Sequence, residues 1–166
     1  MSFKEISAKE LNENPFSLIG DKWMLVTAGN ENKFNTMTAS WGSMGVMWNK
    51  NVVFSFIRPQ RYTYSFLDEN EYFTLSFYTD EYKSSLAICG KLSGRDVNKV
   101  EEAKLTPVFD QKAPYFEQAR LVLVCKKLYK QAMKPEHFID SELESFYPQK
   151  DYHHMFIGEI VKVLIK

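Results

Sequence analysis

The sequence predicts a mainly β protein: a closed or partly closed antiparallel barrel of about six strands, with short helices around it. Two observations and one physical argument lead to this fold class. Several segments have the period of two that strands require, as in residues 71–78 (EYFTLSFY). Aromatic residues make up 15% of the chain, and they favour strands. A barrel would also remove the exposed edges that such apolar strands otherwise present.

The N-terminal half is predicted to alternate strands with two helical segments. Its elements, in order, are a helical start at 9–20, strands at 22–28, 33–41 and 51–57, a helix at 60–70 and a strand at 71–78. Pro15 is expected to break the helical start, and Gly29–Asn30 ends the first strand as a turn signal. Pro59 closes the third strand, and the helix after it should end near Asn70.

The C-terminal half is predicted to contain two helices followed by two long strands. Its elements are helices at 79–90 and 96–104, a strand at 119–133, a short helix or loop at 134–146 and a final strand at 152–166. Thr79 or Asp80 can cap the first helix and Gly90 can end it. Asp96 is placed to cap the second. The first long strand has an apolar first half and a polar second half.

Length, charge and cysteine content restrict the classes of function. With no repeat or linker to divide it, the chain of 166 residues is expected to form a single domain, 1–166. A formal net charge of zero argues against a protein that binds nucleic acid by neutralising phosphates. We expect neither a signal peptide nor a membrane span, because the longest apolar run covers only 121–125. The two cysteines form no CxxC motif, so a reducing, cytoplasmic location is expected.

A segment without acidic residues occupies much of the first half of the chain. Residues 32–67 contain no Asp or Glu, yet they hold Lys33, Lys50, Arg58 and Arg61. The hydroxyl, amide, aromatic and guanidinium groups in this segment would suit a flat aromatic ligand with an anionic tail. The alternative is a pair of solvated basic strands.

One strand in this segment carries a row of hydroxyl groups. On a strand, Thr36, Thr38 and Ser40 share one face, whereas Trp41 lies on the other. The end of this strand and a turn expected at 42–45 could supply N–H and hydroxyl donors to a ligand. The hydroxyl groups could equally mark the solvent side of the strand. No Walker loop or GxGxxG motif occurs, which disfavours a P-loop or Rossmann domain.

Two further segments are rich in hydrogen-bond donors. Arg58, Arg61 and Thr63 follow a predicted strand and precede a predicted helix, where a phosphate would be favoured by the helix N-terminus. An exposed charged turn is the alternative. Later, Ser93 and Lys99 add donors after Gly90, although this stretch could be only a connection between two helices.

The three histidines, His137, His153 and His154, do not suggest a metal site. Adjacent residues on a strand point to opposite faces, so His153 and His154 cannot readily bind one ion. No HxH, HExxH or cysteine cluster occurs, and no metal is expected. One histidine could contact a ligand, or each could be packed or exposed without a function. No Ser-His-Asp set or carboxylate pair stands out.

Four segments, in their order and spacing, resemble the flavin reductase-like, FMN-binding split-barrel family, and most closely its flavoredoxin-like branch. They are 35–41 (NTMTASW), 58–63 (RPQRYT), 90–96 (GKLSGRD) with Lys99, and 153–159 (HHMFIGE). The resemblance extends from about Pro15 to the C-terminus. It implies a Greek-key split barrel, a homodimer, and FMN held near the subunit interface.

The resemblance also implies roles for individual residues. The cofactor-binding residues expected from it are Asn35, Thr38, Ser40, Trp41, Arg58, Arg61, Thr63, Ser93, Lys99 and His137. Asn35 and Trp41 would border the flavin, and Lys99 would approach the ring or its phosphate. Ser40, Arg58, Arg61 and Thr63 would surround the phosphate and ribityl chain. His153 is the candidate beside a nicotinamide. The loop 134–151 matches the family poorly.

The leading prediction is an NAD(P)H-dependent flavin reductase, an FMN-binding oxidoreductase that passes a hydride from nicotinamide to flavin. No acid–base residue is strictly required, because the flavin carries the hydride chemistry. One alternative is an electron carrier whose tightly bound FMN is reduced by a partner protein. Another is a non-catalytic barrel that binds a ligand or nucleic acid, against which the zero net charge counts.

Overall fold

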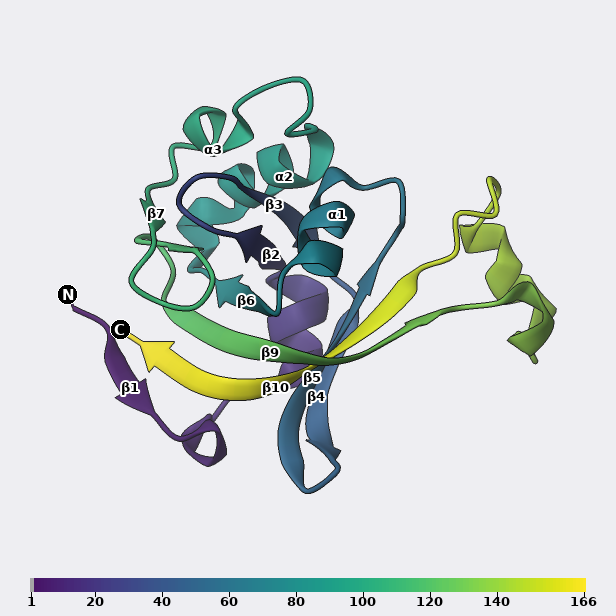
Figure 1. Cartoon of the computed structure of the whole chain (residues 1–166), viewed down its shortest axis with the longest axis horizontal. Helices are drawn as coiled ribbons and strands as arrows, with labels where there is room; N and C mark the ends of the chain where they lie inside the picture. Colours follow the sequence, from purple (N-terminus) through teal and green to yellow (C-terminus); the bar gives the residue numbers. More distant parts are fainter. Residues whose placement is uncertain (1) are drawn as a thin grey trace.

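The structure, a computed structural model, describes residues 2–166 and is built around one long antiparallel sheet that coils on itself (Figure 1). The order across the sheet is β3–β2–β6–β9–β10–β5–β4, and β1 pairs with the end of β10. The strands of this sheet are β1 (Lys4–Ile6), β2 (Met24–Gly29), β3 (Phe34–Ala39), β4 (Gly42–Met47), β5 (Lys50–Ile57), β6 (Tyr72–Phe77), β9 (Leu121–Ala132) and β10 (His154–Ile165). A separate two-stranded pair joins β7 (Pro107–Val108) to β8 (Tyr115–Phe116).

Short helices lie around the sheet. They are α1 (Tyr62–Glu69), α2 (Lys83–Lys91), α3 (Lys99–Glu102), the π-helix Ser17–Asp21 and the 3-10 turns Ala8–Glu10, Asp80–Tyr82, Pro135–His137 and Ser141–Phe146. The predicted mainly β class is confirmed. Each of the six predicted strands is present with its ends within two residues of the expected positions, but residues 2–166 contain ten strands rather than about six. Within these residues, no helix combines the length and apolar character needed to cross a bilayer.

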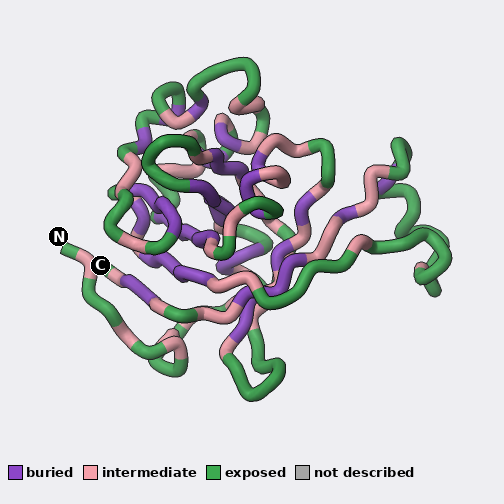
Figure 2. Tube along the Cα trace, viewed as in Figure 1, coloured by how far each residue is buried: buried purple, intermediate pink, exposed green. Residues whose placement is uncertain are grey.

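Strand β2 and the first part of β9, residues 121–125, lie at the centre of the fold because they are covered on both faces. Val26 belongs to the core inside the coiled sheet, together with Phe73 and Phe156. The neighbouring Leu25 points the other way, into a second core beneath α2 that includes Phe116. Figure 2 shows the buried segments gathered here, whereas the β4–β5 turn is exposed.

The far ends of β9 and β10 leave the barrel as a protruding arm (Figure 1). We define the arm as these strand ends together with the connecting residues 133–153. The two strands pair along their whole length, with register shifts at Ile157/Gly158 and Ile160/Lys162. Irregularities of this kind bend a strand and increase its twist, which allows one pair of strands to serve both barrel and arm.

The segment expected to turn at 42–45 does not do so. These residues form the first part of β4, which pairs with β5. The turn lies instead at Trp48 and Asn49, whose φ angles of 54° and 56° are left-handed. Two left-handed residues fit a tight hairpin turn, but the sequence lacks the Asn-Gly or Asp-Gly pair that usually marks one. The predicted turn is therefore wrong.

Three helix boundaries also differ from the predictions. Pro15 starts a helical segment rather than breaking one, since Oδ1 of Asn14 accepts a hydrogen bond from the Phe16 N–H at 3.0 Å. Gly90 lies inside α2 instead of ending it. Asn98, not Asp96, caps α3 through its side chain.

Candidate functional site

Segments that are distant in the sequence meet at one region of the barrel and form two small clefts. They are residues 37–41, 56–63 and 90–99, with His153. The Trp41 cleft has a volume of about 210 Å³ and is lined by Thr38, Ser40, Trp41, Arg58, Arg61 and His153, among others. The Lys99 cleft has a similar volume of about 210 Å³, and its lining includes Arg61, Thr63, Gly90, Ser93, Arg95 and Lys99. Because Arg61 lines both clefts, they adjoin at its side chain.

The Lys99 cleft has the chemistry of an anion site. Its charged lining residues are Arg61, Lys91, Arg95 and Lys99, and neither Asp nor Glu is among the residues that line it. Lys99 is only 3% exposed. Its Nζ donates hydrogen bonds to the carbonyl of Cys89 at 3.0 Å and to that of Leu92 at 3.2 Å. Burial, with a smaller contribution from Arg61, lowers the pKa of Lys99 to about 8.

Arg61 is the second cation held without a carboxylate. Its Nη2 donates to the carbonyl of Gly90 at 3.1 Å. Burial and the nearby Arg58 lower the pKa of Arg61, although a guanidinium stays protonated at neutral pH. Since both Arg61 and Lys99 bind carbonyl groups at the C-terminal end of α2, the negative end of that helix helps to hold both charges.

Asn35 and Thr63 form a buried hydrogen-bonded pair at the Lys99 cleft, which Thr63 helps to line. Nδ2 of Asn35 donates to Oγ1 of Thr63 at 2.8 Å, and both residues are buried. Oδ1 of Asn35 packs against Gly94, where an added Cβ would lie only 2.2 Å from it. Gly94 therefore provides the space that Asn35 occupies. These contacts give both polar residues a structural role that the sequence did not reveal.

The Trp41 cleft is bounded by an indole ring and an imidazole. The Trp41 and His153 rings are 5.2 Å apart between centroids. Nδ1 of His153 lies 2.7 Å from the hydroxyl of Tyr147, and the histidine is 8% exposed. Burial, assisted by the positive charge of Arg58, lowers the pKa of His153 to about 4, so the ring is neutral at pH 7.

The neighbouring His154, the first residue of β10, has a different partner from His153. Its Nδ1 lies 2.7 Å from the hydroxyl of Tyr64 in α1. Residues 2–166 contain no group of three or more His, Cys, Asp or Glu side chains placed to bind a metal ion. His153 and His154 thus belong to separate environments.

Arg58 lines the Trp41 cleft, but its charge is already paired. Its Nη1 lies 2.8 Å from Oδ2 of Asp151, and its Nη2 donates to the carbonyl of Phe146 at 2.9 Å. The guanidinium also stacks on Tyr147, with Cζ 4.8 Å from the ring centroid. The acid-free segment 32–67 could not predict this ion pair, because the carboxylate comes from Asp151 in the arm.

Three hydroxyl residues expected to bind the cofactor have different environments. Thr38 donates to the carbonyl of Leu86 in α2, so its hydroxyl ties β3 to that helix. Ser93 accepts a hydrogen bond from the Arg95 N–H at 3.2 Å and lines the Lys99 cleft. Ser40 lines the Trp41 cleft and is only half-buried, so a ligand can reach it.

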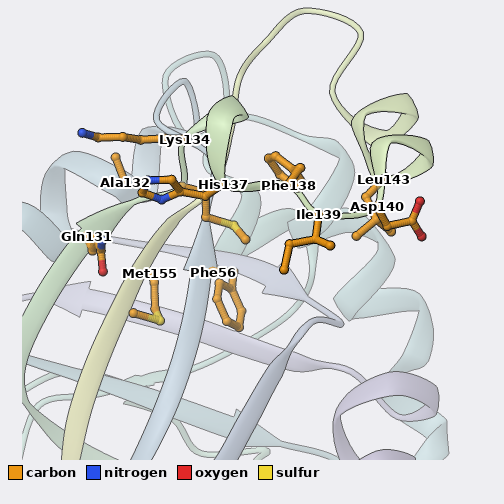
Figure 3. Close-up of a pocket in the computed structure, with 11 residues that line it drawn as sticks. Phe56, Gln131, Ala132, Lys134, His137, Phe138, Ile139, Asp140, Leu143 and Met155 are labelled. Atoms are coloured by element: carbon orange, nitrogen blue, oxygen red, sulfur yellow. The ribbon is translucent and has the colours of Figure 1, made fainter.

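His137 is not brought together with the other predicted residues. It lies in the arm, where it is exposed and lines a separate apolar hollow of about 520 Å³ (Figure 3). In Figure 3, Phe138 and Ile139 descend from the loop, while Phe56 and Met155 lie on the strands below. Phe56 also lines the Trp41 cleft, so the hollow and the cleft share one wall.

Comparisons with known proteins agree with this architecture. A flavoredoxin from Methanosarcina acetivorans matches with a TM-score of 0.69 and 21% identity, over 87% of this chain and 68% of that one. An FMN-binding domain of a flavin reductases-like enzyme from Shewanella baltica OS155 gives 0.71 and 16%, over 99% and 77%. The NADH:FAD oxidoreductase of Streptomyces globisporus C-1027, solved with NAD and FAD fragments, gives 0.65 and 16%, over 87% and 74%.

At these identities the structural matches establish the fold, and they confirm the predicted split barrel. None of the curated proteins compared with the chain matches it. The family model described as the flavin reductase like domain matches residues 16–166, which is most of the chain. The chain therefore belongs to the flavin reductase-like family.

Proposed function

We propose that residues 1–166 form a single flavin-binding domain that holds FMN across the two adjoining clefts and acts as an NAD(P)H-dependent flavin reductase. The observation that carries this proposal is the pairing of the clefts at Arg61. One is lined by cations without a carboxylate, and the other is bounded by Trp41 and His153. A ligand with a phosphate at one end and a flat ring at the other suits this combination.

At the phosphate end, Arg61, Ser93 and Lys99 are the proposed contacts. The carbonyl groups of α2 hold both cations in place before any ligand arrives, so little side-chain ordering remains to be done on binding. Asn35 and Thr63 support this end from behind through their mutual hydrogen bond. Thr38 and Ser40 continue the lining toward the ring end.

At the ring end, Trp41 supplies an aromatic wall and His153 a neutral imidazole. A bound FMN would supply the ring that accepts a hydride and passes electrons on. The chain has to orient that ring and keep one face open for a nicotinamide. His153 is the proposed neighbour of the nicotinamide, because it lines the cleft while its Nδ1 is occupied by Tyr147. His137 would join the site only if the ligand or a second subunit reached the apolar hollow.

We also propose that the chain is a homodimer. Large apolar side chains are exposed on the β4–β5 hairpin and on the arm: Val46 is 75% exposed, Trp48 51% and Ile139 fully exposed. Exposed apolar groups gathered on two projections are typical of an association surface. The arm lies beside the Trp41 cleft, because its residues and Phe56 line the hollow that shares a wall with the cleft. The hairpin turn lies at the opposite end of β4 and β5 from Trp41 and Phe56.

The visible spectrum of the purified protein before and after anaerobic addition of NADH or NADPH tests the proposal. Flavin bands that bleach support the reductase. Flavin bands that persist favour a carrier reduced by a partner protein, as the similarity to a flavoredoxin would suggest. A colourless protein that acquires no flavin on mixing with FMN would falsify the cofactor assignment and favour a non-catalytic barrel.

A further inference from the structure

Residues 146–152 of the arm form a loop that is attached to the barrel at the edge of the Trp41 cleft, chiefly through the side chain of Arg58. Arg58 follows the end of β5 and contacts the loop at three points: the Asp151 carboxylate at 2.8 Å, the Phe146 carbonyl at 2.9 Å and the Tyr147 ring at 4.8 Å. Gln60 adds a second hydrogen bond to Asp151. The Arg58 and Asp151 side chains are only 25% and 17% exposed, so solvent screens their attraction incompletely.

The residues that Arg58 holds are the ones that contact the walls of the cleft. The Phe146 ring meets the Trp41 indole edge-on, with centroids 5.4 Å apart. The Tyr147 hydroxyl lies 2.7 Å from Nδ1 of His153. A movement of the loop would therefore release both Trp41 and His153.

We propose that Arg58 is a positioning residue: paired with Asp151, it holds residues 146–152 against the barrel and thereby fixes Trp41 and His153 at the Trp41 cleft. This inference rests on the proposed function only in taking that cleft as the ring end of a flavin site. It assigns a role to Asp151, Tyr147 and Phe146, and it gives Arg58 a role other than direct binding of the phosphate.

The pair is built so that each partner depends on the other. Oδ1 of Asp151 is buried and finds no hydrogen-bond partner among residues 2–166, so the carboxylate relies on Arg58 and Gln60 at its other oxygen. Removing Arg58 altogether would leave the largely buried Asp151 carboxylate without a counter-charge and with Gln60 as its hydrogen-bond donor, which is destabilising. Removing the carboxylate, or shortening the guanidinium to an amine, is the milder change and the better test.

The protonation of His153 reports on the loop in the protein without any ligand. The groups that face this imidazole are the Tyr147 hydroxyl, the Trp41 ring and the charges of Arg58 and Asp151. The negative charge of Asp151 raises the pKa of His153, so deleting that charge alone would lower it further. Release of the loop would do the opposite, because the imidazole would regain water.

The closing experiment is an NMR titration of the His153 imidazole in the wild type and in Asp151→Ala. We expect the pKa to rise from about 4 toward the value of about 6.5 that an exposed imidazole has. An unchanged or lower pKa would show that the pair does not hold the loop. Arg58→Lys provides a second test, since it keeps the charge but loses the planar fork, and the same rise is expected.

Glu13→Ala is the matched control. It removes the carboxylate from another arginine pair of similar exposure, Arg120–Glu13, and should leave the His153 titration unchanged. Flavin binding gives an independent readout: Asp151→Ala should weaken FMN and riboflavin by the same factor, because only the ring end is disturbed. A loss confined to FMN would place Arg58 at the phosphate instead. If the protein bound neither flavin, the titration would still decide the role of the pair.

Discussion

Arg61 and Lys99 are buried cations whose partners are backbone carbonyl groups. The carbonyls of Cys89, Gly90 and Leu92 come from the last turn of α2, where the helix dipole is negative. When a cationic side chain is held by carbonyl groups, no formal negative charge balances it. When it is paired with a carboxylate, the pair has no net charge. This difference separates Arg61 and Lys99 from Arg58 and makes them the stronger candidates for contact with an anionic ligand.

Replacing Arg61 by alanine should weaken binding of FMN much more than binding of riboflavin, which lacks the phosphate. The loss of one charge-assisted hydrogen bond costs about 1.5–3 kcal/mol, which corresponds to roughly ten- to hundredfold in affinity. Fluorescence titration of both flavins against the wild type and Arg61→Ala measures the difference. If both flavins lost affinity equally, the phosphate would have to lie elsewhere.

Burial of Lys99 should make stability depend on alkaline pH. The pKa is about 8 in the folded chain against an ordinary value of 10.5, so between these values the unfolded chain binds more protons. Folding is then favoured as the pH rises through this window. Urea unfolding at about pH 7.5 and about pH 10 should show the wild type gaining stability relative to Lys99→Met. Burial raises the pKa of the Cys89 thiol to about 11, and Lys99 acts against this rise, so the thiol would respond to the substitution as well. Both proteins are therefore compared in a Cys89→Ala background. Parallel pH profiles would contradict the expectation.

Lys99→Met also separates two positions of this lysine relative to a flavin. If Lys99 lies near the phosphate, its removal should lower the affinity for oxidised FMN and leave the midpoint potential of the bound flavin almost unchanged. If Lys99 lies near the ring, its removal should make the bound flavin harder to reduce and leave the affinity for oxidised FMN almost unchanged. The position of Lys99 in the cation-lined cleft with Arg61 and Ser93 favours the first outcome. If neither quantity changed, its role would be to hold the end of α2.

Among the elements, β10 shows how a glycine permits a strand to change course. Gly158 lies at a register shift between β9 and β10, and a Cβ at this position would be 2.7 Å from Cζ of Phe73. Phe73 is 1% exposed and cannot move aside without disturbing the core. The glycine therefore sets how closely the strand approaches the ring within the barrel.

Gly158→Ala should destabilise the protein by about 1–3 kcal/mol through overpacking against Phe73. Gly45→Ala is the matched control in another strand, since a Cβ there meets no atom within 4 Å. That control should be neutral or slightly stabilising, by less than about 1 kcal/mol. Chemical unfolding of the two variants distinguishes them, and equal effects would mean that Phe73 adapts at little cost.

The strands that could be predicted from the sequence are those with a strong local pattern. The alternation in 71–78 and the apolar run that begins at 121 gave β6 and β9 within two residues. β4 was missed because Gly42 and Gly45 suggested a turn, and because the true turn contains Trp48 rather than glycine. The short β1, β7 and β8 are fixed by their partners, which no local pattern records.

The candidate site also contains some residues that short sequence segments predicted and others that they did not. The residues near Arg61, Ser93 and Lys99 were expected from short segments, and the structure brings them to one cleft. The pairing of Arg58 with Asp151 spans 93 positions and depends on how the arm folds back, so no spacing rule could have predicted it. Burial of Lys99 was also unforeseen, because it follows from packing between α2 and α3.

For the whole molecule, the proposed homodimer should appear in light scattering as about twice the chain mass of 19.4 kDa. Val46→Lys on β4 should shift the protein toward the monomer, since charged residues are depleted from interface cores. Val161→Lys, at another exposed valine (44% exposed) on β10, is the control and should leave the mass unchanged. A wild-type monomer that binds FMN fully would remove the idea of a shared site.

The double-sided cover of β2 and β9 has a consequence for amide hydrogen exchange. β2 is paired on both edges and packed on both faces, and the same holds for the first part of β9, residues 121–125. The amides of these segments should therefore exchange only when the whole domain unfolds. The edge strand β4 and the arm should exchange first, through local opening. The Trp41 cleft joins a slowly exchanging body to a rapidly exchanging loop at Arg58. A ligand bound there would then slow deuterium uptake in residues 146–152 while leaving that of β2 unaltered.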